Sequence, residues 1–375
     1  SYCKTSGPGD MDWKNPNDPA NPYKAGRRFV GLTPDYTLKT PPMLTTWIGT
    51  DHYGLEFSCE SSRGWALVKP NEAMETSRDG DQVLLKVHLI SKPVQLSDKP
   101  RHIRFGLVAT PTKTLLPHIA KARFYDDYTP YLLPGQWGEY PGWHPPLKNQ
   151  AVIEKNLKWV KQTHEMDKKL LINGGWNISA QWNEWDTWGK EMIAEPLSNV
   201  SFSECKQFAA CYRTPYAAFM ANSFGHNARL LGFDGIRFDT VVPSYECQSM
   251  EHDLSAVPNT AQAGCGWRDD EGKLWPSFSL FEQREIWKRL YRIFHGGVIT
   301  NGCIQTPNAA GPIMAIHSFS DHHEIGESYY MHAKTIKDGY PPDMIRAIMT
   351  GEQYGFYAEA NIKGSPLFWN QRNAA

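Results

Sequence analysis

The chain has 375 residues, with 39 basic and 40 acidic side chains and a formal net charge of -1. This balance leaves no basic surplus to neutralise phosphates, which argues against nucleic acid as a main partner. No apolar run approaches the roughly 20 residues that cross a bilayer, so no membrane span is expected, and the length suits two domains or one barrel with an added module.

Tryptophan and cysteine are the informative residue types. The 14 tryptophans favour carbohydrate binding, because indole faces pack on the apolar faces of sugar rings, although large aromatic side chains also fill cores. The seven cysteines include no C-x-x-C pair, so neither a structural zinc site nor any other cofactor is expected. Disulfides from Cys205 to Cys211 or from Cys247 to Cys265 would indicate an oxidising compartment, and buried free thiols are the alternative. With Ser1 as the first residue, we expect a secreted or periplasmic protein.

The first part of the chain divides into two regions. Residues 1–45 are rich in Pro, Gly, Asn and Asp without periodicity and are expected to be irregular. Residues 46–115 alternate short apolar segments with turns, which predicts part of an antiparallel β-sandwich. Its candidate strands are 54–57, 82–90 and 103–107.

Residues 116–375 alternate strand-like runs with longer helical patterns, as β/α units around a parallel sheet do. Apolar residues at three- and four-residue spacing predict helices over 152–163, 216–231 and 281–294. The candidate strands are 122–125, 170–173, 233–239, 297–301 and 313–317, with room for one more near Phe356. The expected fold class is therefore α/β: a (β/α)8-type TIM barrel that falls short of eight visible units, preceded by a partial antiparallel β-sandwich.

The strongest candidate catalytic residue is Asp239. It closes the predicted strand Gly-Phe-Asp-Gly-Ile-Arg-Phe-Asp, and catalytic residues of β/α barrels gather at the carboxyl ends of strands. The two-residue period of a strand puts Arg237 on the same side. Arg237 can therefore hold Asp239 ionised, as a nucleophile or an electrostatic stabiliser requires; an ion pair that only fills a barrel layer is the alternative.

A second polar group follows the predicted strand 313–317. Glycoside hydrolysis needs two carboxyl groups, one ionised and one protonated, and Asp321 or Glu327 is the candidate acid/base partner of Asp239. His322 and His323 are candidate substrate-binding residues. Together with His317 and Asp321 they also offer zinc or iron ligands, but their spacing fits no standard zinc motif and no metal is expected there.

Further candidate substrate-binding residues lie beside other predicted strand ends, and Arg237 is counted with them. Asp126 follows the first strand, and Trp176 with Asn177 would offer a stacking face beside an amide after paired glycines. Trp143 belongs to the aromatic run 137–144, which is either a sugar platform or a wedge over the barrel mouth. The chain has no nucleophile elbow, P-loop or dinucleotide motif, which argues against serine hydrolases, kinases and dinucleotide enzymes.

A family resemblance rests on runs in chain order: RFGLVATPTK (104–113), GFDGIRFD (232–239), CGW (265–267) with GKLWPSFS (272–279), REIWKRLY (284–291), and FSD (319–321) with GE (326–327). These runs resemble a group of bacterial glycoside-hydrolase-like proteins related to glycoside hydrolase family 123, the β-N-acetylgalactosaminidases. The resemblance covers roughly 47–356 and implies a β-sandwich followed by a (β/α) barrel. It also implies a longer protein, so that this chain would be a processed piece, a fragment completed by another chain or by missing segments, or a natural short form.

The resemblance does not extend to the acidic pair of that family. Family 123 enzymes use an adjacent Asp-Glu pair together with the acetamido group of the substrate. In this chain such a pair occurs only as Asp270-Glu271, in a Gly-flanked loop rather than at a strand end.

The sequence thus predicts a glycoside hydrolase that cleaves a complex polysaccharide or glycoconjugate, with a carbohydrate as its partner. The alternative enzyme is a polysaccharide lyase on a uronate-containing glycan, in which Tyr or His removes a proton and Arg237 or a metal neutralises the carboxylate. The third reading is a non-catalytic carbohydrate-binding or assembly protein.

Overall fold

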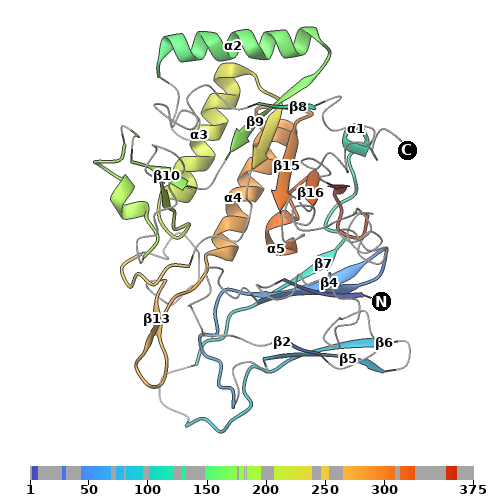
Figure 1. The fold of residues 1–375 in the computed structure, drawn as a ribbon, viewed down its shortest axis with the longest axis vertical. Helices are drawn as coiled ribbons and strands as arrows, with labels where there is room; N and C mark the ends of the chain where they lie inside the picture. Colours follow the sequence, from blue (N-terminus) through green and yellow to red (C-terminus); the bar gives the residue numbers. More distant parts are fainter. Residues whose placement is uncertain are drawn as a thin grey trace, which may run out of the picture.

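The computed structural model describes residues 2–6, 28–30, 44–68, 73–79, 82–95, 101–120, 128–131, 148–174, 177–180, 182, 184–195, 207–238, 246–252, 265–308, 313–325 and 352–360. Two regions follow one another along the chain (Figure 1). Antiparallel sheets occupy the N-terminal part, and a parallel sheet with helices occupies the rest.

Two antiparallel sheets form the N-terminal region. The larger has the order β1 (Tyr2–Ser6), β3 (Leu44–Gly49), β4 (Gly54–Cys59), β7 (Gly106–Thr110). The smaller has the order β2 (Arg28–Val30), β5 (Met74–Asp79), β6 (Gln82–Val87). Phe57 of β4 packs in one hydrophobic cluster with Leu85 and Val87 of β6, so apolar side chains from the two sheets share a core, as in a β-sandwich.

The expectation that residues 1–45 are irregular is wrong for two segments. Strand β1 pairs antiparallel with β3 from Tyr2 opposite Gly49 to Ser6 opposite Thr45, and β2 pairs with β5. The backbone makes these pairings, and they require no periodic pattern of apolar side chains. The domain boundaries at residues 46 and 116 stay predictions.

The parallel sheet has six strands in the order of the chain: β8 (Tyr128–Tyr131), β9 (Lys169–Gly174), β12 (Gly235–Phe238), β15 (Cys303–Asn308), β16 (His322–Ile325) and β17 (Tyr357–Ala360). Every neighbouring pair is parallel. This sequential order is that of a (β/α) barrel wall. Among the described strands, no pairing joins β8 to β17, so a closed barrel is not seen.

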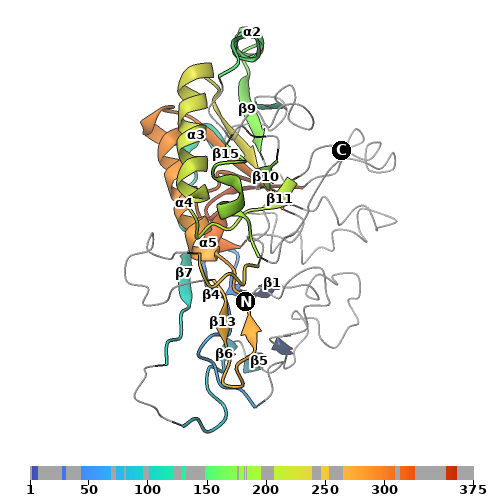
Figure 2. The ribbon, with the colours of Figure 1, turned by 90° about the vertical axis from the view of Figure 1, so that its left-hand side faces the viewer.

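Three long helices alternate with these strands. They are α2 (Gln150–Glu165), α3 (Tyr216–Leu231) and α4 (Leu280–Arg292), close to the predicted ranges. Figure 2 shows α3 and α4 on the same face of the sheet. Helix α3 ends at Gly232, whose φ of 71° lies in the left-handed region that glycine adopts without a steric penalty.

Smaller elements complete the described fold. They are α1 (Pro117–Ala120), the paired strands β10 (Asn177–Ser179) and β11 (Gln207–Ala209), a 3-10 helix (Gly189–Met192), the hairpin β13 (Trp267–Arg268) and β14 (Leu274–Trp275), a π-turn (Ile293–Gly297) and α5 (Met314–His317).

Two predicted strands are wrong. Residues 297–301 form the turn that follows α4, and the strand begins only at Cys303. Residues 313–317 were expected to be a strand, but Met314–His317 form α5. Two backbone N–H groups at the start of α5, those of Met314 and Ala315, donate to the buried carboxylate of Glu56 on β4, both at 2.7 Å. This contact with a distant residue favours the helix and joins the antiparallel sheet to the parallel one.

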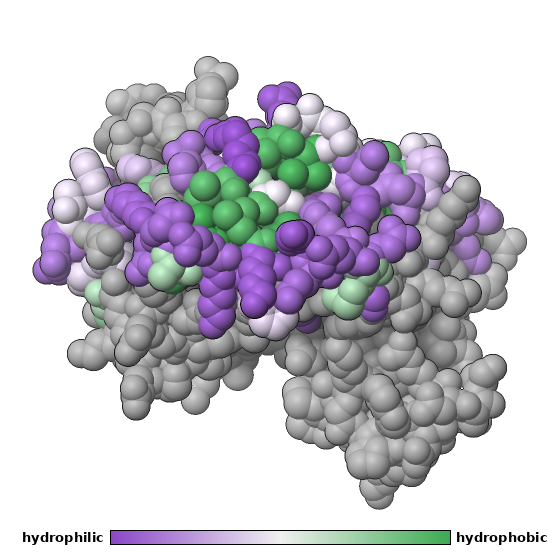
Figure 3. Space-filling model, turned by 90° about the horizontal axis from the view of Figure 1, so that it is seen from above, coloured by the Kyte–Doolittle hydropathy of each residue, from purple (hydrophilic) through white to green (hydrophobic). Residues whose placement is uncertain are grey.

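Most tryptophans that the structure describes belong to cores rather than to an exposed platform. Those that are at most 9% exposed are Trp47, Trp65, Trp182, Trp267 and Trp287. Exposed apolar side chains occur instead on and after α2, where Leu157, Trp159 and Met166 are 40–61% exposed. Figure 3 views the end of the molecule that carries α2, where apolar side chains gather within a polar surround. Within the described residues, no helix has the length and apolarity to cross a bilayer.

Candidate functional site

Strand β12 has one face toward the helices and one face away from them. The Phe238 ring lies 5.3 Å from that of Phe224 on α3 and 4.7 Å from that of Trp287 on α4. Ile236 belongs to the same hydrophobic core. The intervening residue, Arg237, therefore faces away from the helical layer, and it is half-buried. β12 thus carries a guanidinium on the inner face of the sheet.

Arg237 lies in the middle of the sheet. It is in register with Gln305 of β15 on one side and with Asn173 of β9 on the other. Gln305 is fully buried. The inner face beside Arg237 therefore carries a second polar side chain, that of Gln305, near the carboxyl end of β12, as expected of a site that binds a polar ligand.

Several predicted site residues lie outside the described part of the chain. They are Asp239, Glu327, Asp126, Trp143 and Trp176, and of Asn177 only the backbone is described, in β10. Their predicted roles stay predictions. The acidic pair at 270–271 lies in the turn between β13 and β14, where Asp270 forms an exposed ion pair with Arg101 at 3.1 Å.

Asp321 lies at the amino end of β16, not at the carboxyl end of a strand. Its carboxylate Oδ2 accepts a hydrogen bond from the backbone N–H of Ile304 at 2.8 Å, and its own N–H donates to the Ile304 carbonyl at 2.9 Å. His295 Nε2 lies 2.9 Å from the same oxygen. The Asp321 side chain is 1% exposed and that of His295 is 7% exposed. Asp321 therefore clamps the start of β16 to β15.

Asp234 makes the same set of contacts one unit earlier. It precedes β12, accepts from the backbone N–H of Leu170 at 2.9 Å and donates its own N–H to the Leu170 carbonyl at 2.9 Å. His164, at the end of α2, lies 2.8 Å from its Oδ2. The two aspartates thus repeat one device, a carboxylate that joins neighbouring strands at the amino edge. This edge of a β/α barrel contributes to stability rather than to chemistry, so the position of Asp321 does not support the predicted acid/base role.

The two candidate histidines of β16 lie on opposite faces of the sheet. His323 is buried toward the helices, with Nδ1 3.0 Å from Thr306 Oγ1 and its ring 4.5 Å from that of His317. His322 is buried against Tyr357 on the other face, and burial lowers its pKa to about 4. Because strand alternation separates these side chains, His317, Asp321, His322 and His323 do not form one metal site.

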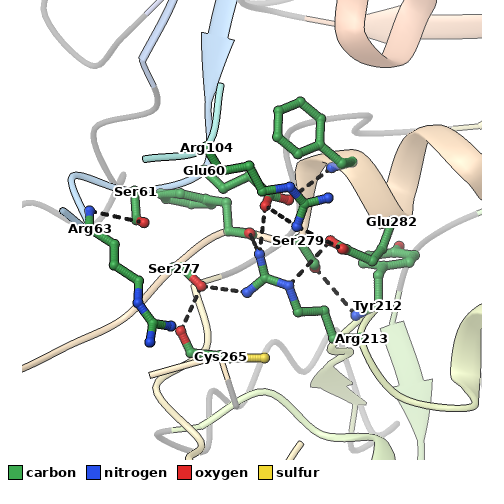
Figure 4. A network of polar contacts seen from close by, with 12 residues as sticks. Glu60, Ser61, Arg63, Arg104, Tyr212, Arg213, Cys265, Ser277, Ser279 and Glu282 are labelled. Atoms are coloured by element: carbon green, nitrogen blue, oxygen red, sulfur yellow. Dashed lines mark hydrogen bonds and ion pairs between the residues drawn. The ribbon is translucent and has the colours of Figure 1, made fainter. Parts of the chain in front are cut away.

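The structure shows a buried ionic network that the sequence did not predict (Figure 4). Arg213 donates to Glu60 at 2.8 Å and to Glu282 at 3.2 Å, and Arg104 lies 3.1 Å from Glu60. Arg213 also donates to the Ser277 hydroxyl. Burial raises the pKa of Glu60 to about 7 although Arg213 opposes this, whereas at Glu282 the two arginines outweigh burial and the pKa is lowered.

This network joins the two regions of the chain. Glu60 directly follows β4, and Arg104 lies two residues before β7 of the same antiparallel sheet, whereas Glu282 lies on α4. The side chains of Glu60, Arg213 and Glu282 are 4–5% exposed, so a substrate cannot reach them. Sequence reasoning singled out the run that contains Arg104, but no local pattern indicates its buried partners.

Comparisons with known proteins give structural similarity only. No protein-family model matches the sequence, and no curated protein matches it significantly. Among solved structures, a cycloalternan-degrading enzyme from Trueperella pyogenes is 10% identical, with a TM-score of 0.44 over 88% of this chain and 51% of that chain. A maltogenic alpha-amylase from Thermotoga neapolitana is 12% identical, with a TM-score of 0.35 over 55% of this chain and 40% of that chain. A family 31 sulfoquinovosidase from E. rectale is 14% identical, with a TM-score of 0.37 over 59% of this chain and 31% of that chain.

These structural neighbours are glycoside hydrolases, and the chain spans about half of their length or less. Identities of 10–14% and TM-scores below 0.5 do not assign the chain to any of their families. The resemblance to family 123 stays a prediction.

Proposed function

We propose that this protein is a glycoside hydrolase that uses Asp239 as its ionised carboxylate. The observation that carries the proposal is the position of Arg237, on the inner face of a central parallel strand near its carboxyl end. Asp239 comes two residues later in the sequence, one residue after the end of β12, and the strand period extended by that residue would place it on the same side. A neighbouring guanidinium favours the ionised form of a carboxyl group, which a nucleophile or a stabiliser of positive charge requires.

Glu327 replaces Asp321 as the second carboxyl group in this proposal. β12 ends at Phe238 and β16 ends at Ile325, so Asp239 and Glu327 both follow carboxyl ends in the sequence. Only β15 separates these two strands, which corresponds to about 10 Å between their axes. Paired carboxyl groups of glycosidases are about 5 to 9.5 Å apart. Because His323, four residues before Glu327, faces the helices, the proposal requires the chain after β16 to turn Glu327 toward the inner face.

The proposed reaction is hydrolysis of a glycosidic bond in a polysaccharide or glycoconjugate. Protonated Glu327 gives its proton to the leaving oxygen as the carbon–oxygen bond breaks, and Asp239 stabilises the positive charge or bonds the anomeric carbon. Water then attacks the anomeric carbon and supplies the new hydroxyl group, which breaks the bond to Asp239 where one has formed, and the proton of that water returns to the Glu327 carboxylate. Arg237 positions Asp239 and favours its ionised form before and after the reaction.

The test compares three variants of the full chain on a panel of aryl glycosides and polysaccharides, with reducing ends as the readout. Asp239→Asn should lower turnover on the order of a thousandfold while the melting temperature stays unchanged. Glu327→Gln should lower turnover less on aryl glycosides whose leaving groups need no proton. Asp270→Asn, in the exposed turn, is the matched control and should keep full activity.

Full activity of Asp239→Asn would overturn the proposal. An unsaturated product that absorbs in the ultraviolet would show a lyase instead, and glycan binding without any product would show a non-catalytic binding protein.

A further inference from the structure

Four side chains outside the parallel sheet form a compact group of sulfur and nitrogen atoms. They are Cys211, Cys247, His252 and Cys265, and their ligand atoms all lie within 4.8 Å of one another. The Sγ atoms of Cys211 and Cys265 are 3.4 Å apart, and Cys247 Sγ lies 3.3 Å from His252 Nδ1. A tetrahedral zinc ion, with bonds of about 2.3 Å to sulfur and about 2.0 Å to nitrogen, holds its ligand atoms about 3.5–3.8 Å apart. The cluster is therefore close to the size of a zinc site.

The group is buried and held by backbone contacts. The three cysteines are at most 2% exposed and pack with Ala194 and Ala209, which are fully buried. The backbone of Cys247 exchanges two hydrogen bonds of 3.0 Å with that of Ser277. The Cys265 N–H donates to the Ser249 carbonyl at 2.7 Å. These backbone hydrogen bonds fix the main chain that carries the cysteine ligands, as hydrogen bonds around the ligands of metal sites do.

The residue after Cys265, Gly266, lies in close contact with the segment that contains Gln248. A Cβ atom at Gly266 would lie 2.2 Å from the Gln248 carbonyl oxygen, so only glycine allows the two segments to meet at this point. The backbone N–H of Glu195 also points at the cluster and donates to Cys247 Sγ at 3.4 Å. Such a contact stabilises a thiolate, which is the form that binds a metal.

One charged side chain lies close to the cluster. Arg213 donates to the Ser277 hydroxyl, and that hydroxyl donates to the Cys265 carbonyl at 2.6 Å, so the cluster borders the network in Figure 4. A neighbouring guanidinium favours the thiolate form of cysteine, which is the form that binds a metal.

We propose that Cys211, Cys247, His252 and Cys265 bind one zinc ion. Three thiolates and one imidazole complete a tetrahedral shell and leave no open position, so the site is structural rather than catalytic. The expected disulfide between Cys247 and Cys265 is not formed, because both thiols are free, and Cys205 lies outside the described residues. The sequence predicted no zinc site because its ligands come from three separate segments that only the fold brings together.

The zinc ion would fasten the long connection that follows β12. Three of its ligands lie between β12 and α4, and the fourth lies just after β11. This connection leaves the same strand end that carries Arg237. The site would thus hold a carboxyl-edge loop in place whether or not the protein cleaves sugars.

The test measures metal in the full chain after purification without chelators. Inductively coupled plasma mass spectrometry should find about one zinc per chain, and Cys265→Ser should lower this below about a tenth. Cys303→Ser, which removes another buried free thiol, is the matched control and should keep its zinc. His252→Cys preserves a ligand and should also keep it, whereas His252→Ala should not. Cobalt exchanged into the wild type should give thiolate-to-metal charge transfer and the intense visible bands of tetrahedral coordination.

Three results would overturn the proposal. The first is folded wild-type protein, with a cooperative melt, that holds no stoichiometric zinc and takes up none when zinc is added. The second is equal zinc content in Cys265→Ser and the wild type. The third is a disulfide between two of the cluster cysteines in the protein as purified. Because the readouts are metal content and spectra, they are independent of the activity of Asp239 variants.

Discussion

Replacing Asp321 by alanine should lower stability rather than remove only an activity. The variant leaves the backbone N–H of Ile304 without its acceptor and His295 without its buried partner. Losing the partner of a buried polar group costs about 1–3 kcal/mol, so the two losses together should lower the free energy of unfolding by about 2–5 kcal/mol.

Asp234 provides an internal comparison for this magnitude. It makes the same backbone contacts, but its side chain is 20% exposed and that of His164 is 45% exposed. Water can replace part of the lost interaction, so Asp234→Ala should cost only about 1–2 kcal/mol. Asp321→Asn keeps an oxygen that can accept from Ile304 and should fall between wild type and Asp321→Ala.

Equilibrium unfolding in urea, monitored by tryptophan fluorescence and far-ultraviolet circular dichroism, measures these differences. The midpoint should fall in the order wild type, Asp234→Ala, Asp321→Ala, at an unchanged dependence on urea. An Asp321→Ala variant with wild-type stability that loses hydrolysis of an active substrate would refute the reasoning and return Asp321 to the catalytic residues.

Three further variants test other buried polar groups. Arg213→Met should lower the free energy of unfolding by about 3–5 kcal/mol, because it leaves the buried carboxylates of Glu60 and Glu282 without their main cation. Arg101→Met breaks only an exposed ion pair and should lower it by less than about 1 kcal/mol. Urea unfolding of the two variants measures this difference. His322 is buried with its pKa lowered from 6.5 to about 4, so its contribution to stability is present above pH 6.5 and is lost as the pH falls toward 4, by about 3 kcal/mol. The free energy of unfolding should therefore depend less on pH between 6.5 and 4 in His322→Leu than in the wild type. An identical pH dependence would contradict the lowered pKa of His322. Glu56→Ala removes the acceptor of two backbone N–H groups of α5 and should cost about 2–3 kcal/mol, with wild-type thermal stability as the contrary result.

The helices were predictable because their signals are local. The apolar periodicity and the glycine that follows define α3 at both ends, as predicted. Apolar residues predict a strand at 297–301, yet the strand that forms, β15, includes the buried polar residues Gln305 and Thr306. Gln305 lies on the inner face with Arg237, whereas Thr306 lies on the helical face beside His323, and apolar patterning reveals neither. Helix α5 depends on Glu56, 258 residues away in the chain, so no local pattern could identify it.

The sequence predicted the orientation of Arg237 on β12 correctly and the position of Asp321 before β16 incorrectly. The side of β12 that Arg237 occupies follows from alternation alone, and the structure confirms it. Asp321 was predicted to follow the carboxyl end of a strand at 313–317. Met314–His317 form a helix instead, so Asp321 lies at the amino end of β16. The cysteine cluster required contacts among segments far apart in sequence, and a count of cysteines and spacings cannot supply them.

Ser277 links the proposed zinc site to the network that joins the two regions. Its hydroxyl donates to the Cys265 carbonyl at 2.6 Å and accepts from Arg213, while its backbone pairs with Cys247. Loss of the metal should therefore disturb the same serine that orients Arg213 toward Glu60. Residues that share one network show coupling energies of about 0.5–3 kcal/mol, so the costs of Cys265→Ser and Arg213→Met should not add in the double variant. The pair Cys303→Ser and Arg213→Met is the control and should be additive. Additivity in both pairs, measured by urea unfolding of all variants in the same zinc-containing buffer, would show that the metal cluster and the ionic network are independent.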